Sequence, residues 1–310
     1  MRIAVVGAGG VGGYFGGRLA AAGADVSFLA RGAQLAALRD GGLRIESELG
    51  NARVIVRAED DPAVIGPVDL VIVAVKLWDT GDVVRHITPL VAPATTVLSL
   101  QNGVVKDEIL REAFGAGQTI GALCYIGAII ARPGVIKHTG TLQRIVVGEF
   151  DGRRSSRVDA FADLCRRAAI DVDISGDIER AIWEKFVFLV GLSGATSVIR
   201  QPIGPIRSNE RARSFLGSLF AETVSVGRAR GVGLAADFAA DRLTFTDTLH
   251  PAFSSSMHGD LERGNRLELP WLQGVVSQFG RDQAIPTPAN DFVGDVLSVY
   301  ADGATKTVHA

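Results

Sequence analysis

A single lysine near the middle of the chain has the surroundings of a proton donor. Lys185 follows Trp183 and Glu184 at the start of a long apolar stretch that has the periodicity of a helix. The chain has only five lysines against 27 arginines. An ammonium group whose pKa is lowered by burial can release a proton near neutral pH, whereas a guanidinium group cannot. Carbonyl reduction needs such an acid because hydride attack leaves an alkoxide. We therefore predict that Lys185 is a general acid; the alternative is a lysine whose stem packs along the helix.

A glycine-rich turn near the N-terminus predicts a site for the phosphates of a dinucleotide. The pattern G-x-G-x-x-G is made by Gly7, Ala8, Gly9, Gly10, Val11 and Gly12. The turn follows a predicted strand and opens a predicted helix, which is the context that this motif requires. Gly7 permits the tight turn, Gly9 lets the backbone approach a pyrophosphate, and Gly12 lets the helix pack on the strand. The helix N-terminus adds N–H donors and a partial positive charge. The alternative is a glycine-rich turn within a core.

The end of the second predicted strand, residues 25–29, indicates which dinucleotide is bound. An NAD site places Asp or Glu there to hold the ribose 2′-hydroxyl. This chain has Arg31 instead, and a guanidinium group can grip a 2′-phosphate through two parallel hydrogen bonds. We therefore expect NADP(H) rather than NAD(H), with Arg31 as a cofactor ligand. A solvated surface arginine is the alternative.

Four further polar residues are candidates for contacts with the cofactor or the substrate. Lys76 ends the most apolar predicted strand and Asn102 follows the next one, so both are expected at the carboxyl edge of the sheet, where ligands bind in open α/β folds. Ser256 belongs to a run of serines whose hydroxyls could hold a carboxylate, and Glu268 follows in a charge-rich stretch. The plainer alternatives are an exposed lysine, an Asn-Gly turn, a helix cap or ordinary helix residue, and a solvated carboxylate.

Two different kinds of structure are expected to position these residues. Strand patterns fill the first half, at 3–6, 25–29, 43–45, 52–56, 68–75, 96–99, 120–130, 135–138 and 144–147. Helical patterns are expected at 11–22, 35–39, 178–192, 211–230, 238–249, 271–279 and 290–300. We therefore predict an α/β fold. A Rossmann-like doubly wound sheet would span residues 1–176, and an all-helical C-terminal domain would span 177–310, with a loose tail over the last ten residues.

Composition narrows the classes of partner and location. Of 310 residues, 47% are hydrophobic and 21% are charged, and the net charge is −2. This fits a folded globular protein and gives no basic stripe for nucleic acid. Cys124 and Cys165 are too few for a disulfide framework and fit a reducing compartment. We expect no signal peptide, no membrane span and no metal site. The predicted location is the cytoplasm, and the apolar helical half could bury a homodimer interface.

In their order and spacing, these segments resemble the ketopantoate reductases (2-dehydropantoate 2-reductases) over nearly the whole chain. The resemblance is carried by the glycine turn, Arg31, Val75-Lys76, Gln101-Asn102-Gly103, Trp183-Glu184-Lys185, Ser255-Ser256-Met257, Glu268 and Ile285-Pro286-Thr287-Pro288. It implies that NADPH lies across the Rossmann domain and that a small 2-oxo acid lies in the interdomain cleft. The implied reaction is the reduction of 2-dehydropantoate to pantoate, a step of pantothenate biosynthesis.

The resemblance also implies a role for each candidate residue. Lys185 would be the general acid, and Glu268 would hydrogen-bond near the reacting oxygen or the cofactor ribose. Asn102 and Lys76 would touch both cofactor and substrate. Ser256 would hold the substrate carboxylate.

Three positions depart from the family's pattern. The family commonly has asparagines four and eight residues after the catalytic lysine, where this chain has Leu189 and Ser193, and another three residues before the serine, where it has Phe253. Each change removes a polar contact that a hydroxylated substrate would use, so the site should discriminate less for a substrate hydroxyl. Our hypothesis is that the pocket is more apolar and that the true substrate is a less polar analogue of ketopantoate.

Two other functions remain open at this point. One is a β-hydroxyacid-type dehydrogenase, which also joins a Rossmann domain to a helical one. The other is a non-catalytic NADP-binding sensor. Lys185 discriminates against the sensor, because a protein that only binds the cofactor has no need of an acid facing the nicotinamide.

Overall fold

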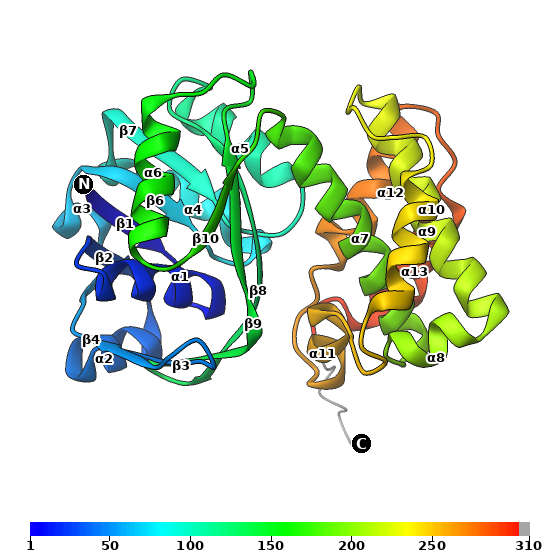
Figure 1. Cartoon of the computed structure of the whole chain (residues 1–310), viewed down its shortest axis with the longest axis horizontal. Helices are drawn as coiled ribbons and strands as arrows, with labels where there is room; N and C mark the ends of the chain where they lie inside the picture. Colours follow the sequence, from blue (N-terminus) through cyan, green and yellow to red (C-terminus); the bar gives the residue numbers. More distant parts are fainter. Residues whose placement is uncertain (304–310) are drawn as a thin grey trace, which may run out of the picture. The chain divides into compact units, whose positions relative to one another are not determined.

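The computed structural model of the chain describes residues 1–303, so most of the expected C-terminal tail lies outside the described residues. The chain divides into two compact units, Met1–Ala181 and the residues from Ile182 onward. The first unit is built on strands and helices, and the second, as far as residue 303, on helices alone (Figure 1). The helix α7 (Ile178–Ile199) begins in the first unit and continues into the second. This confirms the predicted fold class.

A five-stranded parallel sheet organises the N-terminal unit, in the order β5-β2-β1-β6-β7. Its strands are β1 (Arg2–Val6), β2 (Asp25–Leu29), β5 (Arg57–Glu59), β6 (Val68–Val73) and β7 (Val91–Ser99). From β1 the chain first builds the sheet outward through β2 and β5, and it then returns to the other side of β1 with β6. The reversal creates a switch point at the carboxyl ends of β1 and β6. Open α/β sheets bind their ligands at such a point.

Alternate residues of each strand face opposite sides of this sheet and bury two separate apolar cores. On one side, Ile3 and Val5 pack in the core that includes Phe15 of α1 (Gly10–Ala21). On the other, Ala4 and Val6 belong to a core closed by the short helices α3 (Pro62–Ile65) and α4 (Thr80–His86) and by α5 (Val105–Phe114). The remaining elements of the unit's helical layers are α2 (Gly32–Gly41), α6 (Ser156–Arg167), η1 (Leu77–Asp79) and η2 (Thr88–Leu90).

The helix α1 lies between the parallel sheet and a second sheet, and its glycines let it approach both. A Cβ at Gly16 would come within 2.8 Å of Val5 and Phe28 in the parallel sheet. One at Gly17 would come within 2.7 Å of Leu43 in the second sheet. Side chains at these positions would push the helix away from one sheet or the other. The glycines that follow the nucleotide motif therefore serve packing.

The second sheet has the order β10-β9-β3-β4, with β8 paired to β9. Its strands are β3 (Leu43–Glu46), β4 (Ala52–Val54), β8 (Gly121–Arg132), β9 (Val135–Gly148) and β10 (Asp171–Ile174). The hairpin predicted over residues 43–56 is present as the antiparallel pair β3 and β4. The segments predicted as separate strands at 135–138 and 144–147 form the single strand β9. Its pairing with β8 shifts register, which accommodates the residues between the two segments.

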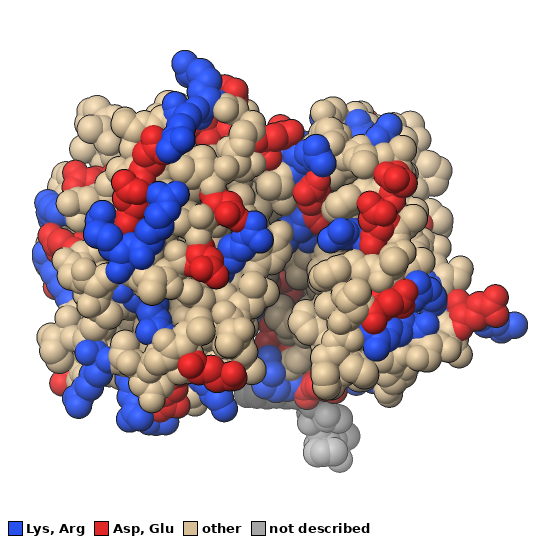
Figure 2. Space-filling model, viewed as in Figure 1, with Lys and Arg blue, Asp and Glu red and all other residues tan. Residues whose placement is uncertain are grey.

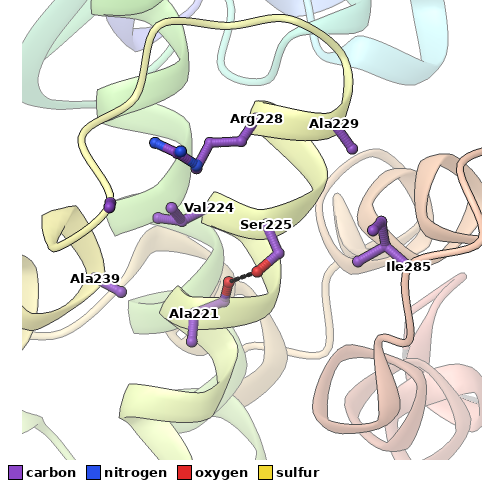
Figure 3. A pocket seen from close by; sticks show the side chains of 8 residues that line it. Ala221, Val224, Ser225, Arg228, Ala229, Ala239 and Ile285 are labelled. Carbon is purple, nitrogen blue, oxygen red and sulfur yellow. Dashed lines mark hydrogen bonds between the residues drawn. The ribbon is translucent and has the colours of Figure 1, made fainter.

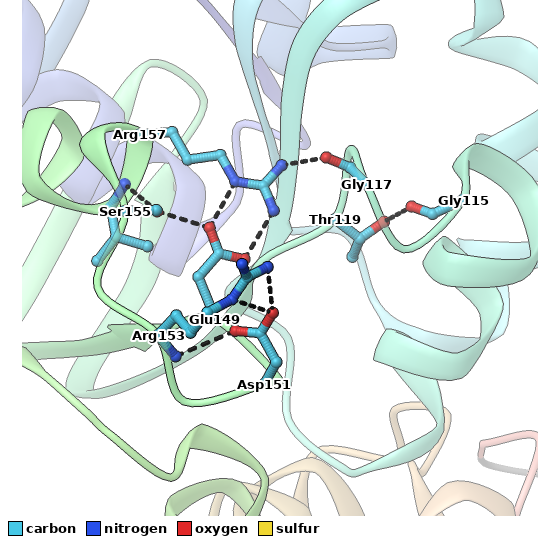
Figure 4. A network of polar contacts seen from close by, with 9 residues as sticks. Gly115, Gly117, Thr119, Glu149, Asp151, Arg153, Ser155 and Arg157 are labelled. Carbon is cyan, nitrogen blue, oxygen red and sulfur yellow. Dashed lines mark hydrogen bonds and ion pairs between the residues drawn. The ribbon is translucent and has the colours of Figure 1, made fainter.

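A half-buried carboxylate ties the end of β9 to the start of α6 (Figure 4). Arg157 donates from Nε and Nη2 to the two oxygens of Glu149 at 2.6 and 2.7 Å. Ser155 donates to Glu149 at 2.6 Å and caps α6 by accepting the N–H of Val158. The hydrogen bonds from Arg157 lower the pKa of Glu149, against the opposing effect of burial. This network fixes where α6 begins.

The C-terminal unit is an assembly of helices around α9 (Glu210–Ala229), which packs with α8, α10, α12 and α13. The other helices are α8 (Ile203–Ser208), α10 (Phe238–Phe245), α11 (Ser256–Glu262), α12 (Gln273–Asp282) and α13 (Pro288–Leu297), with short turns η3 (Thr246–Thr248), η4 (Leu269–Trp271) and η5 (Ser298–Tyr300). Close packing joins α7 to α9, because a Cβ at Gly191 would lie 2.2 Å from Phe220 and one at Gly227 would lie 2.8 Å from Trp183.

By length and composition alone, α7 could cross a membrane, whereas the sequence analysis expects no membrane span. It has 22 residues, and 67% of its most apolar 18-residue stretch is buried inside the protein. Extensive burial of this kind is typical of a core helix, which meets the same criteria of length and apolarity.

Candidate functional site

The glycine turn lies at the carboxyl end of β1, as its motif predicts. Gly7 has a φ of +99°, a region that favours glycine, and its N–H donates to the carbonyl of Leu29 in β2 at 3.0 Å. A Cβ on Gly7 would lie 2.8 Å from the side chain of Val75, which follows β6. The turn is therefore packed directly at the switch point between β1 and β6.

The space beside Gly9 is open, whereas the other glycines of the motif are closely packed. A Cβ on Gly9 would meet nothing within 4 Å. At Gly10 and Gly12 it would lie 2.1 Å from the carbonyl oxygens of Ala128 and Gly7. The N-cap residue of α1 is Gly9, which has no side chain to accept hydrogen bonds from the first N–H groups of the helix. A helix start of this kind beside a bare backbone suits a pyrophosphate, and the residues of the turn therefore fit a dinucleotide.

Gln34 of α2, which the sequence analysis did not single out, holds this turn in place. Its Nε2 donates to the carbonyl of Ala8 at 2.8 Å, and its Oε1 accepts the N–H of Gly134 at 2.9 Å. Gly134 lies between β8 and β9, so Gln34 ties the turn to the second sheet. Its partners are 26 and 100 residues away in sequence. No local pattern could have identified them.

Arg31 follows β2 at the same edge of the sheet and has an acidic neighbour. Its side chain is 84% exposed, and its Nη2 lies 3.0 Å from Oδ2 of Asp79 at the end of η1. The segment that carries Asp79 follows β6, on the other side of β1. A guanidinium group and a carboxylate from two separate elements thus meet at the strand ends.

Lys76 and Asn102 follow the neighbouring strands β6 and β7, as predicted. Lys76 is exposed, and its Nζ lies 5.5 Å from the centre of the Trp78 ring. The buried Gln101 joins the two segments, because its Nε2 donates to the carbonyl of Val75 at 2.9 Å. Asn102 comes next in the chain and is half-buried. The structure therefore brings the glycine turn, Arg31, Lys76 and Asn102 to one edge of one sheet.

A buried ion pair lies behind the Asn102 turn and was not predicted. The side chains of Lys106 and Asp107 are 1% and 7% exposed. Lys106 Nζ lies 2.8 Å from each carboxylate oxygen of Asp107 and donates to the carbonyl of Ala122 in β8 at 2.9 Å. It also contacts the carbonyl of Ser99, the last residue of β7, at 3.4 Å. Burial raises the pKa of Asp107, and the charge of Lys106 opposes that rise.

In the C-terminal unit, Lys185 shares one face of α7 with the residue that anchors the serine run. Lys185, Leu189 and Thr196 have the spacing of a single helical face. Thr196 Oγ1 lies 2.9 Å from Ser255 Oγ, and Ser255 caps α11 by accepting the N–H of His258 at 3.0 Å. Ser256 is therefore the first residue of α11, and it is exposed. Ser255 makes the helix cap, so of the two plainer roles considered for Ser256 the structure shows that of a helix residue.

The three positions that depart from the family's asparagines differ in their surroundings. Leu189 is half-buried, and Phe253 is 42% exposed. Ser193 is fully buried, and within residues 1–303 its hydroxyl has no hydrogen-bond partner. Neither apolar side chain can replace the hydrogen bonds of an asparagine.

Glu268 and the Ile285–Pro288 motif both lie at the start of a helical segment. Glu268 is largely buried and directly precedes η4. Pro288 is the first residue of α13, and the carboxylate of Glu222 in α9 accepts the N–H groups of Ala289 and Asn290 at 2.8 and 2.9 Å. A carboxylate at a helix N-terminus is a stabilising arrangement. It fixes the start of α13, directly after the motif.

A recess of about 500 Å³ lies on the outer side of α9, next to α10 and Ile285 (Figure 3). Its walls are mostly small or apolar, with Ala221, Val224 and Ala239 among them. Arg228 also lines the recess and donates to the carbonyl of Leu234. None of the predicted site residues is among its described lining residues. The recess is therefore separate from the residues with candidate chemistry.

On the face shown in Figure 2, basic and acidic side chains are intermixed. Among residues 1–303, no group of three or more His, Cys, Asp and Glu side chains could hold a metal ion. Both cysteines are buried, and burial raises the pKa of Cys165 to about 12.

Comparison with known proteins covers both units. The family model described as ketopantoate reductase PanE/ApbA matches residues 3–152, and the model of its C-terminal domain matches residues 177–301. The uncharacterized oxidoreductase YkpB of Bacillus subtilis is 34% identical over 97% of this chain and 99% of that protein. A 2-dehydropantoate 2-reductase of Mesorhizobium japonicum is 28% identical over 94% of this chain and 95% of that one. The crystal structure of 2-dehydropantoate 2-reductase from Geobacter metallireducens superposes with a TM-score of 0.89 at 32% identity, covering 96% of this chain and 99% of that chain.

Proposed function

This chain belongs to the ketopantoate reductase family, and from that premise we propose that it is an oxidoreductase that uses NADPH to reduce a small 2-oxo acid to the 2-hydroxy acid. The observation that carries the proposal is the glycine turn at the switch point, with open space beside Gly9 and with Arg31 at the next strand end. In this proposal, residues 1–176 bind the cofactor and residues 177–310 supply the groups that meet the substrate.

In the N-terminal unit, the proposed cofactor ligands all follow strands of the parallel sheet. The turn from Gly7 to Gly12 binds the pyrophosphate through backbone N–H groups. Arg31 binds the ribose 2′-phosphate through its planar guanidinium group. Lys76 and Asn102 contact the cofactor and the substrate. Gln101 supports both of them, because it links the segments that follow β6 and β7.

In the C-terminal unit, the proposed groups hold the substrate and deliver a proton. A bound reduced nicotinamide supplies the hydride that attacks the carbonyl carbon. Lys185 donates a proton from Nζ to the carbonyl oxygen, which acquires negative charge during that attack. Ser256 donates a hydrogen bond to the substrate carboxylate, a role supported by its exposed position at the start of α11. Glu268 hydrogen-bonds near the reacting oxygen or the cofactor ribose.

We further propose that the substrate is less polar than ketopantoate. Leu189 and Phe253 stand where family members commonly have asparagines, and neither can hydrogen-bond a substrate hydroxyl. A site built to hydrogen-bond a hydroxyl rejects an analogue without it far more strongly than an apolar site does. This chain should therefore turn over ketopantoate and an unhydroxylated 2-oxo acid with comparable efficiency, or should prefer the latter.

The test is a direct comparison of substrates with the purified full chain. NADPH oxidation would be followed by absorbance with ketopantoate and with 3-methyl-2-oxobutanoate, which has the same carbon framework without the hydroxymethyl group. We expect turnover of at least one of them, with kcat/KM for the unhydroxylated acid equal to or higher than that for ketopantoate. Strong preference for ketopantoate would contradict the apolar-pocket hypothesis alone. NADPH binding without turnover of any 2-oxo acid would favour the sensor.

A further β-hydroxyacid-type activity is tested in the oxidative direction. NADP⁺ reduction would be measured with 2-hydroxy and 3-hydroxy acids of matched length. Preference for the 3-hydroxy acids would indicate the β-hydroxyacid-type dehydrogenase. The homodimer and the cytoplasmic location stay predictions.

A further inference from the structure

The ion pair between Arg31 and Asp79 bears on the choice between the two nicotinamide dinucleotides. We infer that Asp79 limits the preference of this chain for NADPH over NADH, because it occupies Arg31 and adds a negative charge beside the place of the 2′-phosphate. This inference rests on the proposed function, in which Arg31 binds that phosphate. It assigns a specificity-determining role to an acidic residue 48 positions away in sequence.

The geometry supports competition for one guanidinium group. Arg31 Nη2 donates to Asp79 Oδ2 at 3.0 Å, so the carboxylate takes one of the five N–H donors that an arginine offers. Arg31 is 84% exposed and Asp79 is 26% exposed, so the pair lies at the surface where a ligand can reach it. A surface ion pair of this kind is weak. A phosphate can therefore displace Asp79 from Arg31 or bind Arg31 together with it.

The negative charge of Asp79 disfavours binding of the 2′-phosphate even when Arg31 contacts both groups. A phosphate monoester carries a charge of about −1.5 to −2 at neutral pH. Two anions on one guanidinium group lie only a few ångströms apart, and like charges at that separation repel measurably even in water. Lys76, three residues before Asp79, is unchanged in the variants proposed below, so its charge does not affect the comparison.

The same carboxylate does not oppose NADH. In NAD sites, an acidic residue near this strand end accepts a hydrogen bond from the ribose 2′-hydroxyl. Asp79 presents an acceptor of that kind beside Arg31. Its charge therefore weakens the binding of NADPH but not that of NADH. The difference in affinity between the two cofactors becomes smaller as a result.

The variant Asp79→Asn removes the charge and keeps the shape and an acceptor oxygen. We expect the Kd for NADPH to fall on the order of tenfold at low salt and the Kd for NADH to change less than twofold. Asp82→Asn is the matched control. Asp82 is an exposed acid three residues further on and pairs with Arg85, so its removal changes the net charge equally without touching Arg31. High salt should shrink the gain of Asp79→Asn, because exposed charges are screened.

The measurement is direct binding of NADPH and NADH to the full chain by fluorescence or calorimetry, with the folded state checked by circular dichroism. A Kd ratio for the two cofactors that stays within twofold of wild type in Asp79→Asn would overturn the inference while leaving the proposed function intact. The inference is also overturned, with the proposed function intact, if Asp82→Asn lowers the Kd for NADPH as much as Asp79→Asn does. If the wild type binds neither dinucleotide, the proposed function falls first and the inference with it.

Discussion

Replacing Lys106 by methionine should destabilise the N-terminal unit by about 3–5 kcal/mol at neutral pH, because it leaves a buried carboxylate without its partner. Methionine has a similar length and no charge, so the change removes the interaction rather than the volume. Both side chains are nearly inaccessible to water, at 1% and 7% exposure. The loss should therefore greatly exceed that of an exposed pair, which is worth at most about 1 kcal/mol.

The structure accounts for this magnitude through the contacts that disappear. Lys106 Nζ lies 2.8 Å from both oxygens of Asp107 and donates to the carbonyl of Ala122 at 2.9 Å. Hydrogen bonds to charged groups contribute roughly 1.5–3 kcal/mol each, and the groups left behind stay buried. The removal of both charges should cost less. Lys106→Met combined with Asp107→Asn is therefore expected to recover part of the lost stability.

The penalty should depend on pH in a direction fixed by the raised pKa of Asp107. Burial raises that pKa, and Lys106 opposes the rise, so removal of Lys106 should raise it further. An acid with a higher pKa in the folded state than in the unfolded state favours folding below its unfolded pKa. This contribution is lost as the pH rises through the folded pKa. The Lys106→Met variant should therefore be closer to wild type at about pH 5 than at about pH 7.

Urea unfolding followed by circular dichroism at both pH values would measure these differences. Lys137→Met, at an exposed lysine of β9, is the matched control and should change stability by less than about 0.5 kcal/mol. The reasoning is refuted if Lys106→Met is no more destabilising than Lys137→Met. It is also refuted if the double variant is less stable than the single one at neutral pH.

Three further predictions concern the proposed site and its frame. Lys185→Ala should lower turnover by about 10²–10⁴ while leaving the Kd for NADPH unchanged; a loss of cofactor binding instead would contradict its role as an acid. Gly9→Ala should keep the thermal stability of the wild type but lose NADPH affinity, since its Cβ would fill the open space beside the turn. Gly12→Ala should instead lower the stability by roughly 1–3 kcal/mol, since its Cβ would meet a carbonyl oxygen at 2.1 Å. Arg157→Ala should cost roughly 1–2 kcal/mol at neutral pH. Because Arg157 lowers the pKa of Glu149, this contribution is present above the unfolded pKa and is lost as the pH falls through the folded pKa, so thermal melts of variant and wild type should converge in acid.

The sequence was sufficient for the features that depend on local pattern. The glycine turn, the strand that ends before Lys76 and the apolar face of α7 each have a periodicity or spacing that one segment contains in full. The fold class follows from the alternation of such segments. Strand limits were predicted to within a few residues at β1, β2 and β6, because buried parallel strands are short, uniformly apolar runs.

The elements that were not predicted depend on contacts between distant segments or have weaker sequence patterns. The helix α6 was missed although it carries a signal, a cap at Ser155 followed by buried residues at helical spacing from Val158 to Cys165. The pairing of β3 with β9 joins residues far apart in sequence, such as Arg44 and Val135, so no single segment predicts the second sheet. A doubly wound sheet was predicted, but the division of the strands into two sheets with α1 between them became visible only in the structure.

Site residues followed the same division. Lys106 and Asp107 stand in a run of charged residues that is typical of a solvated helix start, and only the tertiary structure shows that both are buried. Asp79 could not be matched with Arg31, since several acids occur in the same region and the pairing depends on how β2 and β6 flank β1. Gln34 has no motif at all.

The position of α1 between two sheets has a consequence for how quickly the nucleotide associates. With backbone packed against a sheet on either side, α1 cannot tilt or slide without opening one of two apolar interfaces. The loss of chain entropy in the turn at its start therefore accompanies folding and is not incurred again on binding. Association should proceed in one kinetic phase at a rate set by diffusional encounter, without a slow rearrangement of the turn.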